Sequence, residues 1–138
     1  MANASEFIDV PVSADQVWKL IGGFNSLPDW LPFIVKSELS EGGRVRSLQT
    51  ADGLVIVERL EAFDNAMRSY SYSISQAPFP VTDYLATLRV EMLESGQTSR
   101  VTWAGRFTPV GVSEEEAVEL FTGIYRGGLE ALLANFQD

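Results

Sequence analysis

A chain of 138 residues with 46% apolar side chains, among them three Trp, four Tyr and eight Phe, has enough apolar surface for one folded core. Its formal charge of −9 argues against nucleic-acid binding, which depends on clustered Lys and Arg. Because Cys and His do not occur, the chain has no thiolate nucleophile, no imidazole base and no usual zinc ligand. We therefore expect a single domain over residues 1–138 with neither a metal nor another cofactor.

The start of the chain has no basic segment followed by an apolar run, and no apolar stretch approaches the roughly 20 residues of a membrane span. We expect a cytoplasmic protein without integral membrane association, present as a monomer or homodimer.

The N-terminal quarter predicts one strand and two short helices. Residues 4–10 form the strand, and a helix follows over 14–22. Ser13 and Gln16 have the spacing of a capping box, and a glycine pair ends this helix. A second short helix is expected over 26–32, with a serine as its cap, a proline in its first turn and another proline at its end.

The middle of the chain alternates between apolar and polar residues, which indicates strands. Turn signals divide it, and Asp52-Gly53 is the strongest hairpin signal among them. Six consecutive strands joined mostly by tight turns predict an antiparallel meander. The expected strands cover residues 33–40, 43–51, 54–63, 67–76, 82–93 and 99–109.

The last segment, 113–137, predicts one long amphipathic helix packed against the sheet. Ser113 and Glu116 have the spacing of a second capping box, and three glutamates in the first turn suit the helix dipole. A single helix cannot fill the concave face of a curled seven-stranded sheet as densely as a second sheet would. We therefore expect a cavity between them.

Three glycines stand inside this helix, although each costs about 1 kcal/mol relative to alanine. Gly123 and Gly127 share one face, and Gly128 is turned toward the apolar stripe. Two interpretations stay open for Gly128: close packing of the helix backbone against a bulky residue such as Trp103, or volume left free for a ligand.

Three segments carry a resemblance to a known family: "VPVSADQVWKLIGGFNSLPDWLPFI", "GGRVRSLQTADGLVIVERLEAFD" and "LFTGIYRGGLEALL". Their order and spacing resemble the START-like (Bet v 1-like, SRPBCC) superfamily, and within it the bacterial proteins of polyketide cyclase/dehydrase type. The matching elements are Pro11, Val17-Trp18, Trp30-Pro32, Gly43 with Arg46, Glu58-Arg59-Leu60 and Asp64.

The resemblance covers the whole chain and implies an α+β helix-grip fold. In that fold a seven-stranded curved antiparallel sheet wraps around a long C-terminal helix, with two short helices between strands 1 and 2. The enclosed pocket takes an apolar or amphipathic small molecule. Related domains carry lipids, bind hormones, cyclise polyketides or serve in regulatory complexes, so the resemblance implies no single activity.

Alternation along the strands predicts which side chains face the interior. Tyr70 and Tyr72 of one strand bring two hydroxyls into it this way, and each needs a partner, either in the protein or in a ligand. The expected inward residues are Tyr84, Ala86, Leu88, Val90 and Met92 of one strand, Val101, Trp103 and Phe107 of the next, and Tyr70, Tyr72 and Ile74 of a third.

The same alternation predicts charged residues on the inward face of the Asp52-Gly53 hairpin. Glu58 shares a face with Leu54, Ile56, Leu60 and Ala62, whereas Arg44 and Arg46 share one with Leu48. Arg46 opposite Glu58 would form a buried ion pair, which is costly to desolvate. Two interpretations stay open: a structural cross-strand pair, or a polar anchor for a ligand in which Glu58 serves as general acid or base.

The main functional hypothesis is the binding of a lipid, polyketide or aromatic metabolite in the cavity. An alternative is a cyclase or dehydratase-like enzyme in which Glu58 or a pocket tyrosine transfers a proton, and a third is a regulatory or interaction protein with an unused cavity. Trp30, followed by Leu31 and Phe33, either gates the cavity or packs in the core. The proline-flanked loop around Phe79 either closes the same mouth or is a plain connection between strands. The expected ligand-binding residues are Trp30, Arg46, Glu58, Tyr70, Tyr72, Tyr84, Leu88, Trp103, Phe107, Phe121, Tyr125 and Gly128, with Glu58 as the catalytic candidate.

Overall fold

The computed structural model describes residues 1–136 and contains the expected elements in the expected order. A short 3-10 turn, Glu41–Gly43, stands between the second and third strands. The elements are β1 (Ala2–Val10), α1 (Ala14–Ile21), α2 (Leu27–Trp30), β2 (Ile34–Ser40), β3 (Val45–Thr50), β4 (Val55–Asp64), β5 (Ser69–Gln76), β6 (Val81–Met92), β7 (Ser99–Pro109) and α3 (Glu114–Ala134).

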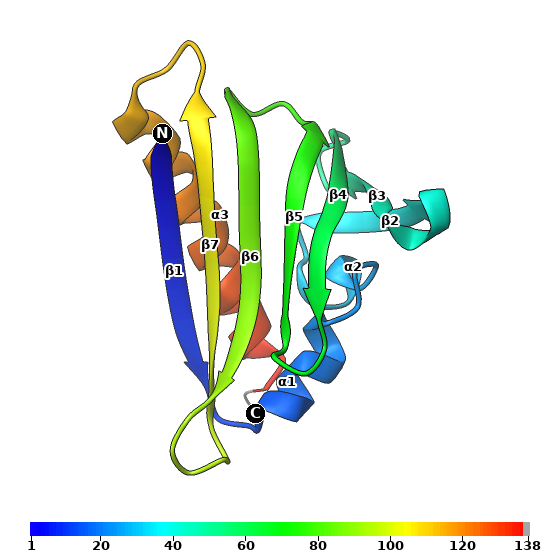
Figure 1. Ribbon diagram of the computed structural model, residues 1–138, viewed down its shortest axis with the longest axis vertical. Helices are drawn as coiled ribbons and strands as arrows, with labels where there is room; N and C mark the ends of the chain where they lie inside the picture. The colour runs from blue at the N-terminus through cyan, green and yellow to red at the C-terminus, as the bar shows by residue number, and fades with distance from the viewer. Residues whose placement is uncertain (137–138) are drawn as a thin grey trace.

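The strands form one antiparallel sheet in the order β1-β7-β6-β5-β4-β3-β2. Strands β2 to β7 are a meander, and β1 returns to pair with β7. Figure 1 shows the sheet curving around α3, which runs behind β1, β7 and β6. This arrangement confirms the helix-grip α+β fold, with a seven-stranded curved antiparallel sheet, a long C-terminal helix and two short helices between β1 and β2.

The helix ends follow largely from local hydrogen bonds. The capping box of α1 is confirmed: the Ser13 hydroxyl accepts from the Gln16 amide at 3.3 Å, and the Ser13 amide donates to the Gln16 side chain. At the start of α3 Ser113 accepts from the Glu116 amide at 3.0 Å, but within residues 1–136 the Glu116 side chain makes no return hydrogen bond, so the second capping box is only half formed. The last residue expected in that helix, 137, lies outside the described residues.

The expected cap of α2 is wrong. Ser26 precedes the helix, but its hydroxyl donates to the carbonyl of Gly23 at 2.7 Å instead of accepting from a helix amide. The helix is also shorter than expected, because Leu31 is extended, as the residue before a proline tends to be.

Four predicted inward side chains are exposed, each for a local reason. Leu54 is 44% exposed in the hairpin turn, and Ala62 is turned outward by the register shift between Leu60 and Ala62. Met92 is 57% exposed at the very end of β6. Arg44 lies before β3 in helical backbone, so strand alternation does not apply to it.

The core lies between the concave face of the sheet and α3. From the helix, Phe121, Tyr125, Leu129 and Leu132 are almost completely buried, and Phe107 meets them from β7. Within residues 1–136, no helix is long and apolar enough to cross a bilayer.

Candidate functional site

A small cavity of about 50 Å³ remains between the concave face of the sheet and α3. Its polar lining comes from three neighbouring strands of the meander and from β6, and its apolar lining includes α2, β2 and α3. Six of the residues expected at the ligand site line it: Arg46, Glu58, Tyr72, Tyr84, Trp103 and Phe121.

The predicted ion pair lies on this cavity wall. The register of the hairpin places Arg46 opposite Glu58, and both Nε and Nη2 of Arg46 contact Oε1 of Glu58, at 2.8 and 2.7 Å. The two side chains are 1% and 8% exposed. Burial raises the pKa of the Glu58 carboxyl above its ordinary value, against the attraction of Arg46.

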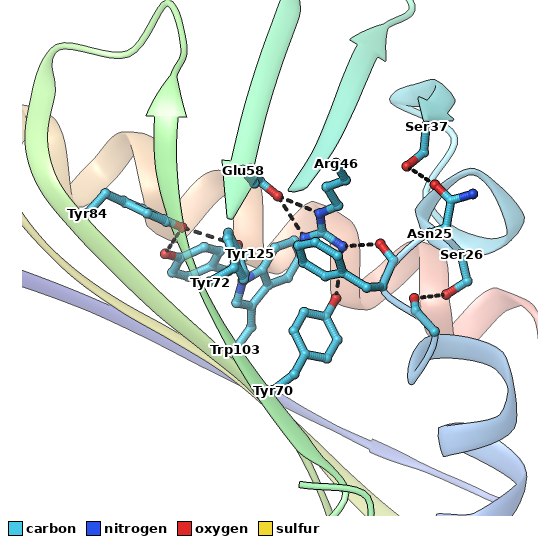
Figure 2. A network of polar contacts seen from close by, with 12 residues as sticks. Asn25, Ser26, Ser37, Arg46, Glu58, Tyr70, Tyr72, Tyr84, Trp103 and Tyr125 are labelled. Atoms are coloured by element: carbon cyan, nitrogen blue, oxygen red, sulfur yellow. Dashed lines mark hydrogen bonds and ion pairs between the residues drawn. The ribbon is translucent and has the colours of Figure 1, made fainter. Parts of the chain in front are cut away.

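Other groups of the protein bind the Arg46 guanidinium through hydrogen bonds and aromatic contacts (Figure 2). Its Nη1 donates to the carbonyl oxygen of Phe24 at 2.8 Å and to the hydroxyl of Tyr70 at 3.3 Å. Its guanidinium carbon lies 4.1 Å from the ring centre of Phe24 and 5.0 Å from that of Tyr72. The guanidinium is therefore a structural cation that fixes Glu58, and most of its donors are already occupied.

One carboxylate oxygen of Glu58, Oε2, has no hydrogen-bond partner among residues 1–136. Within residues 1–136, both contacts to its carboxylate reach Oε1, and no hydrogen bond reaches Oε2. Glu58 lines the cavity, so Oε2 is the acceptor that a molecule in the cavity would meet.

Three tyrosines and a tryptophan form a chain of hydrogen bonds beside this carboxylate (Figure 2). Trp103 Nε1 donates to the Tyr72 hydroxyl at 3.0 Å, Tyr72 and Tyr84 hydroxyls lie 3.4 Å apart, and those of Tyr84 and Tyr125 lie 2.5 Å apart. Burial raises the pKa of all three hydroxyls, so each keeps its proton. The three hydroxyls have three protons for two tyrosine–tyrosine hydrogen bonds, so one hydroxyl proton has no tyrosine acceptor, and it is the Tyr72 proton when Tyr125 donates to Tyr84 and Tyr84 to Tyr72.

A glycine in β7, not among the expected site residues, makes this chain of hydrogen bonds possible. Gly105 lies in the middle of β7, and a Cβ at this position would overlap the Tyr125 hydroxyl. The signal was present, because a glycine inside a buried strand often marks a close approach by another group.

The glycines of α3 divide into two kinds. A Cβ on Gly128 would lie 2.7 Å from the Trp103 ring and 3.2 Å from Leu31, so close packing explains this glycine. A Cβ on Gly123 or Gly127 would meet no atom of residues 1–136 within 4 Å. These two glycines line an open apolar groove of about 510 Å³ along α3.

Only a thin wall separates the groove from the cavity. Leu31, Phe33 and Ile124 line both spaces. Phe33 is 45% exposed, whereas Leu31 is buried, so the wall reaches from the surface to the interior.

Gly128 lines the groove, and the remaining expected site residues lie behind the cavity wall. Leu88 and Phe107 are core residues, and Tyr70 and Tyr125 support the wall through Arg46 and Tyr84. Trp30 is 2% exposed and packs edge-on against Trp103, and its indole N–H has no partner within residues 1–136. Leu48, Ile56 and Ile74, which were expected to face inward, also line the cavity, whereas Leu27 and Ile124 line it without having been singled out from the sequence.

Nothing in the described chain resembles a metal centre. Within residues 1–136, no three acidic side chains come close enough together to hold an ion.

A curved antiparallel sheet that grips one long helix over a lined cavity defines the helix-grip class. Residues 1–137 match the family described as "Polyketide cyclase / dehydrase and lipid transport", and the chain belongs to this family. The resemblance seen in the sequence is confirmed. No match was found among curated proteins.

Solved structures agree closely. XoxI from Bacillus cereus is 56% identical with a TM-score of 0.97, over 100% of this chain and 97% of that one. An uncharacterised protein from Bacillus thuringiensis is 55% identical with a TM-score of 0.97, over 99% and 100%. The Zhui aromatase/cyclase from Streptomyces sp. R1128 shares the fold, with 19% identity and a TM-score of 0.77 over 96% and 92% of the two chains.

Proposed function

We propose that this protein binds a hydrophobic or amphipathic small molecule, such as a lipid, a polyketide or an aromatic metabolite, between the sheet and α3. The observation that carries the proposal is an aromatic cavity that holds an unused carboxylate oxygen and an unused tyrosine proton directly behind an apolar groove. Ligand sites typically combine a mostly apolar lining with a few polar groups of this kind.

Size decides how a ligand would be accommodated. The cavity of about 50 Å³ has room for a few water molecules, whereas ligand pockets usually measure about 300 to 1,000 Å³. The groove of about 510 Å³ lies within that range. Displacing Leu31 and Phe33 joins the two spaces, so the segment after α2 is the proposed gate.

The family description supports the same class of ligand. It combines polyketide cyclases and dehydrases with lipid transport, and both activities involve largely apolar molecules. The aromatase/cyclase relative adds only the fold, because its sequence identity is 19%.

Native mass spectrometry of the protein purified from its own host tests the proposal, followed by thermal shifts across a library of lipids and aromatic compounds. Gly127→Leu fills the open groove and should abolish the thermal shifts, whereas Glu119→Leu, exposed and outside the groove lining, should preserve them. Repeated recovery of bare protein without any shift would contradict the proposal and favour a regulatory protein with an unused cavity.

A second candidate function is an enzyme of cyclase or dehydratase type. Glu58 favours it, because a carboxyl with a raised pKa and a free oxygen stands beside neutral tyrosine hydroxyls in a small, mostly apolar cavity. Glu58→Gln should then abolish turnover of a genuine substrate and leave the fold intact, and Glu61→Gln on the outer face of β4 is the matched control. Loss of stability alone would make Glu58 structural.

A further inference from the structure

The chemistry of the ligand's polar group follows from the charges around the cavity. We infer that the ligand presents an uncharged hydroxyl, of alcohol or phenol type, to Glu58, and that the site discriminates against a carboxylate on the same skeleton. This inference rests on the proposed binding function and narrows its ligand class.

The charges around the cavity already balance. Arg46 and Glu58 are both buried and neutralise one another through two short contacts to Oε1. A carboxylate would bring a second negative charge into an apolar space, where an uncompensated charge is costly. The titratable and charged groups that face this space are Arg46 from β3, Glu58 from β4, Tyr72 from β5 and Tyr84 from β6, with Tyr125 of α3 behind Tyr84.

Arg46 is the only cation among these groups, and its hydrogen-bond donors are largely occupied. Arg46 donates to Glu58, to the carbonyl of Phe24 and to the hydroxyl of Tyr70, and aromatic rings cover its faces. An arginine that recognises a carboxylate usually does so through two parallel hydrogen bonds, and Glu58 occupies the Nε and Nη2 donors that would make them. The geometry does not favour an anion here.

The free hydrogen-bonding groups match a hydroxyl. Oε2 of Glu58 accepts, and the tyrosine chain has one proton to donate when it runs from Tyr125 through Tyr84 to Tyr72. A hydroxyl group donates one hydrogen bond and accepts another, so it satisfies both. A carboxylate has no proton for Oε2 and would leave two acceptors facing one another.

Among residues 1–136, the approach to the cavity offers no alternative anchor for an anion. Every residue that lines the groove is apolar or glycine, from Leu31 to Ala131, and the whole chain carries a formal charge of −9. An anionic group would therefore gain nothing at the groove either.

An acid and an alcohol differ in the number of protons that are taken up when they bind beside Glu58. An acid binds beside Glu58 only when one proton is shared between the two carboxyl groups, whereas an alcohol binds beside the ionised carboxylate. Exchanging the alcohol for the ionised acid therefore consumes one proton, whatever the pKa of Glu58 in the free protein. The ratio of the two affinities, alcohol over acid, must rise about tenfold for each pH unit.

Titration calorimetry with the full chain compares 2-naphthol with 2-naphthoate, and 1-decanol with decanoate, from about pH 6 to about pH 8. We expect the alcohol of at least one pair to bind about tenfold or more tightly than its acid at neutral pH, with the ratio rising as stated. An acid that binds as well as its alcohol, or a ratio independent of pH, overturns the inference and leaves the proposed function intact. Binding of none of the four compounds overturns both.

Substitution of the carboxylate supplies a second readout. Glu58→Gln leaves the Arg46 charge without its partner, so a ligand carboxylate becomes the compensating anion. We expect the alcohol-to-acid ratio to fall at least about tenfold and to lose its pH dependence. Glu61→Gln, which removes the same charge from the exposed face of β4, should keep the original ratio. An unchanged ratio in Glu58→Gln contradicts the inference, and if this variant does not fold, the pH series on the unsubstituted protein decides.

Discussion

At the scale of single residues, Arg46 and Glu58 are a buried pair in which each charge depends on the other. Counted over the whole residue, backbone included, Arg46 is 1% exposed and Glu58 is 6% exposed. Removing one partner of such a pair leaves an uncompensated charge, whereas replacing both with apolar side chains is often neutral or stabilising.

We predict that Arg46→Met lowers the free energy of unfolding by about 3 to 5 kcal/mol, because Glu58 loses its counter-charge. The double variant Arg46→Met, Glu58→Met should recover most of that loss. Urea unfolding followed by circular dichroism measures both. A double variant no more stable than Arg46→Met would show that the pair itself is strongly stabilising.

The tyrosine chain predicts an order of stabilities. Tyr84 is its middle member, so Tyr84→Phe leaves the Tyr125 hydroxyl buried without its partner and should cost about 1 to 3 kcal/mol. Tyr125→Phe removes the end of the chain, and Tyr84 keeps its contact with Tyr72, so the cost should be smaller. Chemical denaturation of both variants tests this order, which the reverse result would refute.

At the scale of elements, α3 carries glycines for different reasons on adjacent faces. Gly127 faces open groove, so Gly127→Ala should stabilise the protein by up to about 1 kcal/mol through helix propensity. Gly128→Ala should destabilise it, because the Cβ would press on the Trp103 ring. Melting temperatures of the two variants give the comparison. If both variants were stabilised equally, the Trp103 ring would have to shift at little cost in free energy to make room for the Cβ of residue 128.

Element types and order were predictable because local signals agree with the fold, as the Ser13 capping box and the Asp52-Gly53 turn illustrate. The hairpin even placed Arg46 opposite Glu58. The predicted inward orientation of a side chain was wrong where the strand alternation is interrupted, as at Ala62 beside a register shift. The glycine inside β7 indicated that some group approaches closely at Gly105, but the sequence did not identify that group as the Tyr125 hydroxyl, because the contact joins two elements through tertiary packing.

At the scale of the whole molecule, the fold produced the expected cavity but filled most of it with rings. Phe121 meets Phe79 at 5.3 Å, Tyr84 at 5.0 Å and Phe107 at 4.7 Å between ring centres, which accounts for the small volume. A ligand therefore competes with packing that already stabilises the protein, so the affinity depends on how easily the wall of Leu31, Phe33 and Ile124 moves.

The pH dependence of global stability carries the signature of Glu58. Its folded-state pKa is raised by burial, so between the ordinary glutamate pKa of about 4.3 and the folded value the native state binds more protons than the unfolded chain. Stability from this group is complete below that window and is lost as the pH rises through it.

Asp9, whose pKa is lowered by its hydrogen bond to Arg100, acts in the opposite direction, but it is present in every variant and cancels in a difference. The free energy of unfolding of the unsubstituted protein minus that of Glu58→Gln should therefore fall as the pH rises from about 4 and then level off. Urea titrations at a series of pH values measure this difference. A difference that rises with pH would mean that Arg46 outweighs burial and lowers the pKa of Glu58.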